Sequence, residues 1–164
     1  MTRVAFTILG EPASKANSRE IVPRKKRMPD GSTKTVPVSI KSEKAIEYER
    51  DAVRQIPPRC RVQLQGPVCV TLRIFYASER PDLDESVVLD VLQDRYRTVK
   101  RGDGNVRELV QRGVYINDRQ VREKHVFHGI DKRNPRAEIV VEALQAQQAG
   151  LDLAMPVEDP LEVR

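Results

Sequence analysis

Residues 80–85 of this chain read Arg-Pro-Asp-Leu-Asp-Glu, and they join the clearest strand pattern in the sequence to an apolar helical stretch. Before them, apolar and polar residues alternate over residues 67–77, which predicts a strand with one buried face. After them, apolar side chains recur at helical spacing, which predicts a helix near residues 85–96. The apolar positions of that helix are Val87, Val88, Val91 and Leu92. We expect the rest of the fold to be built around this strand and helix.

The acidic residues of this junction allow two interpretations. In an extended chain Asp82 and Asp84 project to one side while Leu83 points to the other, toward the core. Carboxylates this close repel one another, and a hard cation such as Mg²⁺ relieves the repulsion. Asp84 is also a good N-cap for the helix that follows, because acidic residues complement the helix dipole. Spacing alone leaves both interpretations open.

The remaining periodic segments predict an α+β fold. Alternating patterns indicate strands near residues 3–9, 121–128 and 136–144, and a short edge strand near 35–40 that contains Pro37. A second helix is expected near residues 43–55, capped by Ser42. We therefore expect a small mixed β-sheet packed by two main helices, with the carboxylates at one end of the sheet.

Two segments are strongly basic. Residues 15–34 contain seven bases and two acids and include a turn-forming stretch, which is typical of a hairpin tip or a solvated loop. Residues 95–112 contain six bases and two acids around the turn at 102–105, which indicates a basic excursion from the domain. Phosphate contact is the functional interpretation of both segments.

Charge and composition favour a polyanionic partner. The net charge is +5 and the isoelectric point is about 9.4. Residues 147–164 carry −3, so we expect one basic domain over residues 1–146 and an acidic, flexible C-terminal tail. No stretch approaches the roughly 20 apolar residues that span a bilayer, and no export signal is visible. We expect a cytoplasmic protein with reduced thiols and no membrane partner.

A zinc site is not expected from local spacing. Cys60 and Cys69 lie nine positions apart without a Cys-x-x-Cys pair, and His125 and His128 offer no zinc spacing with them.

Four motifs in a fixed order suggest a family. They are Gly10-x-Pro12-x-x-Lys15-x-x-x-Arg19, Lys41-Ser42 with Tyr48, Arg80-Pro81-Asp82-Leu83-Asp84, and Tyr115-Ile116-Asn117-Asp118-x-Gln120-Val121. Each motif is weak alone, but their order and spacing resemble those of the RusA-type Holliday-junction resolvases over about residues 4–144.

The resemblance implies a RusA-like homodimer that cuts four-way DNA junctions in recombination and repair with Mg²⁺, for which Mn²⁺ substitutes. The catalytic, metal-binding acids would be Asp82, Asp84 and Asp118, with Glu85 as a further candidate ligand. Two same-face carboxylates joined by a third from a distant segment suit metal-assisted phosphodiester hydrolysis. The basic residues expected to contact DNA are Lys15, Arg19, Arg80, Lys100 and Arg101.

The sequence departs from the family at the start of the helix. Glu85 replaces the usual asparagine, and Val88 replaces a lysine that the family uses in catalysis. Lys15, Lys100 or Arg101 could supply that charge from another loop. The alternatives are a protein of this fold that binds junctions or branched DNA with weak or no cleavage, a metal-dependent nuclease for flaps or RNA, and a basic domain unrelated to nucleic acid.

Overall fold

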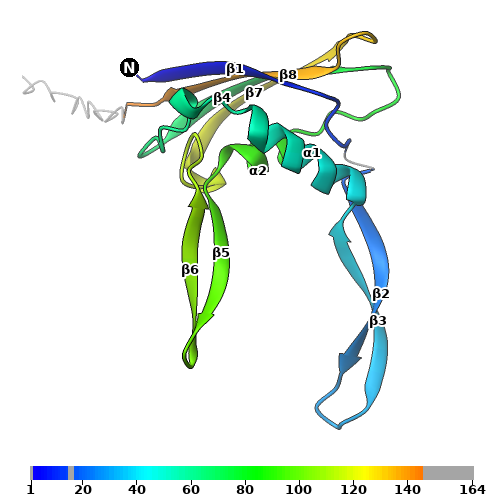
Figure 1. The fold of residues 1–164 in the computed structure, drawn as a ribbon. Coiled ribbons are helices and arrows are strands. Elements are labelled where there is room, and N and C mark those ends of the chain that lie inside the picture. Colours follow the sequence, from blue (N-terminus) through cyan, green and yellow to red (C-terminus); the bar gives the residue numbers. More distant parts are fainter. Residues whose placement is uncertain (1, 15–16, 146–164) are drawn as a thin grey trace, which may run out of the picture.

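The computed structural model describes residues 2–14 and 17–145 and has the expected α+β class (Figure 1). A four-stranded mixed sheet packs against two helices, and two hairpins extend from this body. Lys15 and the acidic tail over residues 147–164 lie outside the described residues. No helix within the described ranges is long and apolar enough to cross a membrane.

The sheet has the strand order β1-β8-β4-β7. Its members are β1 (Arg3–Leu9), β8 (Arg136–Ala143), β4 (Val68–Tyr76) and β7 (Val121–Ile130). Strand β8 pairs antiparallel with both β1 and β4, whereas β7 pairs parallel with β4. Four of the expected strands are thus confirmed, and the parallel pairing of β4 with β7 brings together segments more than forty positions apart.

The core lies between one face of this sheet and the helices. On β4, the side chains of Val68, Val70, Leu72 and Ile74 are fully buried. The helices α1 (Glu43–Gln55) and α2 (Ser86–Leu92) contribute to the same hydrophobic cluster. The alternating pattern of residues 67–77 therefore arises because successive side chains of β4 point to the core face and to the opposite, open face of the sheet.

Helix α1 has the expected bounds, whereas α2 is shorter than expected. Ser42 caps α1, because its Oγ accepts a hydrogen bond from the backbone N–H of Ala45 at 3.2 Å. Helix α2 ends at Leu92 and not near residue 96, since Gln93 forms a β-bridge with Tyr115 and the chain then enters a strand.

The two hairpins account for the basic segments. The first pairs β2 (Arg19–Arg27) with β3 (Thr33–Lys41), and the second pairs β5 (Arg95–Arg101) with β6 (Gly104–Gln111). The expected edge strand at 35–40 therefore belongs to a hairpin and not to the main sheet, which is a correction. In Figure 1 both hairpins extend away from the sheet, beyond the helices. The expected basic excursion over residues 95–112 is the second hairpin.

Candidate functional site

The acidic segment 80–85 folds back against the end of β4 through one tyrosine. The Tyr76 hydroxyl donates to the carbonyl oxygen of Asp82 and accepts from the backbone N–H of Asp84, both at 3.3 Å. Leu83 packs against the hydrophobic core, as expected. Tyr76 is itself fully buried, so a core residue fixes the position of the acidic backbone.

Asp84 is a buried carboxylate without a basic partner. Its residue is 9% exposed, and its Oδ1 accepts a hydrogen bond from the backbone N–H of Ser86 at 2.9 Å. Glu85, and not Asp84, is the N-cap residue of α2, so the capping interpretation is corrected: Asp84 lies one position earlier and its carboxylate accepts from the first N–H of the helix. No base within the described residues forms an ion pair with Asp84, Asp82 or Asp118. Because a buried charge without a counterion is costly, this carboxylate favours a nearby cation.

Two further acids, Glu11 and Glu85, lie near Asp84. Burial raises the pKa of Tyr76, and the negative charges of Asp84, Glu11 and Glu85 raise it further. The Glu11 carboxylate accepts from the backbone N–H of Ala77 at 3.0 Å, and it pairs with a lysine of α1. Sequence reasoning did not select Glu11, because it lies more than seventy positions before Asp84 in a turn.

Glu85 is already paired with a base. Its carboxylate lies 2.5 Å from the Nζ of Lys124 on β7, and this ammonium holds the pKa of Glu85 below its usual value. Sequence reasoning missed Lys124, which reaches the start of α2 from a neighbouring strand. Val88, where the resemblance leads one to expect a lysine, is fully buried. The positive charge at this site therefore comes from β7 and not from α2.

The motif around Asp118 fixes its loop to the segment that leads into β4. Asp118 opens a short 3₁₀ turn, η2 (Asp118–Gln120). The Gln120 side chain accepts from the backbone N–H of Ile116 at 2.7 Å and donates to the carbonyl oxygens of Leu64 and Gly66 at 2.8 Å. Gln120 thus has a structural role, and it leaves the Asp118 side chain exposed at the surface.

Asp118 lies near a second buried tyrosine, Tyr115, which contacts α2. The Tyr115 hydroxyl donates to the carbonyl oxygen of Leu89 at 2.9 Å. Burial raises the pKa of Tyr115, and the charges of Asp118 and Asp90 raise it further. Asp118 and Asp90 therefore both lie near the Tyr115 hydroxyl, whereas Asp84 lies just before α2.

The three aspartates do not form a compact ligand set. In the described part of the chain, the only three His, Cys, Asp or Glu residues with ligand atoms within 4.8 Å of one another are Cys69, Glu123 and His125. The donor chemistry of Asp82 and Asp84 still fits magnesium, because Mg²⁺ keeps several waters and needs only one or two direct carboxylates.

The expected DNA-contacting bases are distributed over the hairpins and the acidic segment. Arg19 begins β2, Arg80 is exposed beside the acids, and Lys100 and Arg101 end β5. Arg101 pairs with Glu108 across its hairpin at 2.5 Å, whereas Lys100 forms no ion pair within the described residues. Lys15 lies outside these residues and is not placed.

The two hairpins have a larger net positive charge than the whole chain. Residues 19–41 contain seven bases and two acids, and residues 95–111 contain five bases and two acids. Together they carry +8 in a chain of net charge +5, so the rest of the chain is net negative. Their roots meet at α1, because Lys41 and Arg95 both pair with Glu49.

No protein-family model and no curated protein matches this chain. What the chain does is therefore inferred from the placement of its own residues.

Proposed function

We propose that this chain is a magnesium-dependent endonuclease of the RusA type that cuts four-way DNA junctions and acts as a homodimer. The observation that carries the proposal is the separation of charge. Two exposed basic hairpins project past the helices (Figure 1), and a buried carboxylate without a counterion lies at the start of α2.

The hairpins suit DNA in shape as well as in charge. A two-stranded β-ribbon fits the major groove of B-DNA, and lysine and arginine side chains along it reach the phosphates. Both hairpins contain such side chains, and both are rooted on α1 through Glu49. A branched substrate would present two arms to the two hairpins.

Asp82 and Asp84 are the residues that would hold the metal. The Tyr76 hydroxyl and the Ser86 N–H orient Asp84, so one carboxylate oxygen remains for a cation or its water shell. Bound Mg²⁺ would supply water activation and charge stabilisation at the scissile phosphodiester. Asp118 would contribute through the water shell of the metal and not as a direct ligand, and Lys124 would offer positive charge beside Glu85.

The homodimer follows from the substrate. A four-way junction has approximate two-fold symmetry, and its resolution requires two matched cuts. An isologous dimer with one active site per subunit would supply both cuts.

Cleavage of a synthetic four-way junction tests the proposal. We expect nicking with Mg²⁺ or Mn²⁺, and a loss of about 100-fold or more in Asp84→Asn and Asp82→Asn, because the metal contributes several kcal/mol to transition-state stabilisation. Asp51→Asn, on the exposed surface of α1, is the matched control and should cleave normally. Parallel assays on linear duplex, flap and RNA substrates would identify a nuclease of different specificity.

A second function is favoured by the open spacing of the aspartates and by the burial of Val88. It is binding of junctions or branched DNA with weak or no cleavage. Tight binding of the junction without nicks in either metal would support this function and overturn the endonuclease.

The contact between the second hairpin and DNA can be tested separately. Each phosphate contact contributes about 0.9 to the slope of log K against log salt. We therefore expect the double substitution Lys100→Ala and Arg101→Ala to reduce the slope by about 1–2. The control substitutes Lys132 and Arg133, in the turn between β7 and β8, with Ala. An unchanged slope in the hairpin variant would remove this contact from the proposal.

A further inference from the structure

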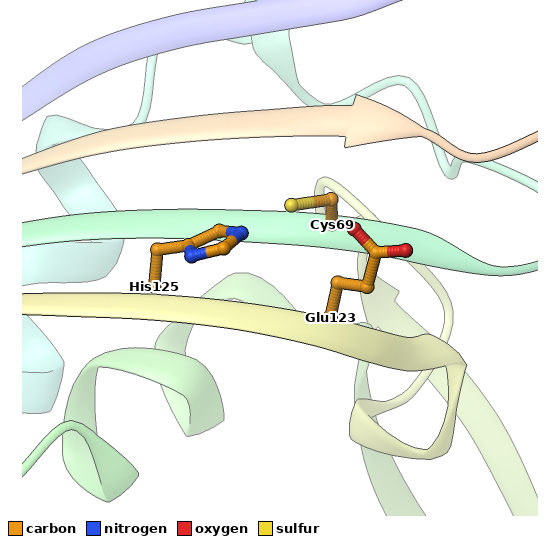
Figure 2. A group of neighbouring side chains, drawn as sticks. All are labelled: Cys69, Glu123 and His125. Atoms are coloured by element: carbon orange, nitrogen blue, oxygen red, sulfur yellow. The ribbon is translucent and has the colours of Figure 1, made fainter.

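A second cluster of potential metal ligands lies on the open face of the sheet, away from the helices. It contains Cys69 of β4 and Glu123 and His125 of β7, whose side chains gather over the two neighbouring strands (Figure 2). One ligand atom from each residue lies within 4.8 Å of the other two. The core face of the same strands carries Val68 and Val70, so this cluster is separate from the acids near α2.

Strand pairing explains how these residues meet. In the parallel register Cys69 lies opposite Glu123, and Thr71 lies opposite His125. Glu123 and His125 are two positions apart on β7, so both project to the open face. The register shifts between Val68 and Cys69, a type of irregularity that re-aims side chains at functional sites. The ligands are therefore fixed by two paired strands and not by a mobile loop.

The donor set selects the class of metal. A thiolate, an imidazole and a carboxylate are ligands for Zn²⁺ and related transition metals, whereas Mg²⁺ prefers oxygen donors and retains its water. Donor atoms around a tetrahedral zinc ion lie about 3.3–3.8 Å apart, given zinc–ligand distances of about 2.0–2.3 Å. Because the ligand atoms lie within 4.8 Å of one another, a contraction of at most about 1.5 Å is needed. Rotation of the exposed Glu123 and His125 side chains provides it.

The surroundings supply negative charge and a place for a fourth ligand. Glu142 on β8 lies opposite Cys69 on the other side of β4. The Glu142 carboxylate is about half exposed and lies 3.4 Å from the guanidinium of Arg3. Three protein ligands leave the fourth tetrahedral position for Glu142 or for water.

We propose that Cys69, Glu123 and His125 form a binding site for a zinc-class divalent transition metal. The metal replaces the proton of the Cys69 thiol, and that proton passes to solvent. The bound ion links β7, at the edge of the sheet, to the central strand β4. This site does not depend on the proposed nuclease function, and its metal differs from the magnesium expected near α2.

Cobalt titration of the full-length, tag-free and reduced protein tests this site. We expect Co²⁺ to bind with one-to-one stoichiometry and to give a thiolate-to-cobalt charge-transfer band. Zn²⁺ should displace the cobalt, whereas excess Mg²⁺ should leave the band unchanged. Zn²⁺ should also raise the midpoint of thermal unfolding, because a ligand that binds only the folded state stabilises it.

The chain contains two cysteines and two histidines, so the cysteine ligand and the histidine ligand each have a matched control. Cys69→Ser should abolish the band, whereas Cys60→Ala should retain it, because Cys60 lies in the core cluster. Loss of a residue that only supports a metal ligand weakens metal binding by about 10–100-fold. His125→Gln removes a ligand itself, so it should weaken Co²⁺ binding by at least this factor. His128→Gln should bind Co²⁺ normally, because His128 stacks on Tyr76 on the other face.

Circular dichroism should confirm that each variant is folded. A wild-type protein without the band, or a band that survives in folded Cys69→Ser, would overturn the proposal. Loss of nuclease activity without a change in this band would count against the function near α2 and not against this site.

Discussion

Lys124 of β7 forms an ion pair with Glu85, the residue immediately before α2, at 2.5 Å. This pair joins the edge strand of the sheet to the segment that carries Asp82 and Asp84. It also places a lysine beside the acids, whereas Val88 of α2 is fully buried. The pair therefore has a structural effect that can be measured apart from any catalytic role.

The ion pair should make stability depend on pH. Lys124 lowers the pKa of Glu85, although burial and the charge of Asp84 oppose this shift. Because the folded pKa is lower than the unfolded value of about 4.3, the stabilisation is present above that pH and is lost as pH falls through the folded pKa. We expect Lys124→Met to cost about 0.5–1 kcal/mol at pH 7, since the pair is partly exposed.

Urea unfolding of both proteins at a series of pH values measures this effect. The difference between wild type and Lys124→Met should shrink as pH falls from 5 toward 3, by roughly the size of the pair energy. Lys132→Met, in the exposed turn after β7, should show no such trend. A difference that stays constant with pH would show that Glu85 does not depend on Lys124.

A second network should stabilise the roots of the hairpins. Glu49 of α1 pairs with Lys41, the last residue of β3, and with Arg95, the first residue of β5. Lys41 also lies 2.7 Å from Asp90 of α2. Because the Glu49 side chain is only 14% exposed, Glu49→Gln should lower the free energy of unfolding by about 1–3 kcal/mol.

The exposed neighbour Glu47 provides the control for this network. Glu47→Gln should change the free energy of unfolding by less than about 0.5 kcal/mol. Equal effects of the two substitutions in urea unfolding would show that the network contributes nothing specific. A larger effect of Glu49→Gln would confirm that one carboxylate holds both hairpin roots.

The main sheet and α1 could be predicted from the sequence because their signals are local. Alternation over residues 67–77 reflects burial of every second side chain of β4, and Ser42 marks the start of α1. The hairpins are exposed on both faces, so β2 and β5 show charge and not periodicity. The sequence shows that these segments are basic, but it does not show that their strands pair as regular hairpins.

The side-chain clusters depend on contacts between distant segments. Nothing in the spacing of Cys69 and His125 indicates that they meet, because only the parallel pairing of β4 with β7 brings them together. The same pairing explains why Lys124 was missed. Asp84 could be selected as a candidate because it lies in a run of acids just before a predicted helix, whereas its position relative to Asp118 depends on contacts between distant segments.

A lysine in place of Val88 should destabilise the protein. Val88 is fully buried, so Val88→Lys would place an ammonium in the core or force the helix to move. We expect a loss of about 3 kcal/mol or more, or an unfolded protein, because an unpaired buried charge is strongly unfavourable. Ser86→Lys, on the exposed side of α2, should change stability by less than about 0.5 kcal/mol.

Thermal and urea unfolding would distinguish these two variants. A stable Val88→Lys protein would mean that α2 can turn this position toward the acids. In that case junction cleavage by the variant would show whether the added lysine contributes to catalysis.

Gly113 should be intolerant of any side chain, because two backbone segments cross there. A Cβ at this position would lie 2.4 Å from the Leu92 oxygen and 2.7 Å from the Asp94 nitrogen. The Gly113 N–H also donates to the buried Asp94 carboxylate at 2.7 Å. Backbone atoms cannot rotate away as a side chain can, so Gly113→Ala should lower the free energy of unfolding by about 3 kcal/mol or more.

Gly104→Ala, whose Cβ would approach no closer than 4.0 Å to Arg101, should cost less than about 1 kcal/mol in the same urea unfolding experiment. Similar small costs for both substitutions would contradict the close approach of the segment after β6 to the end of α2, on which the position of the second hairpin depends.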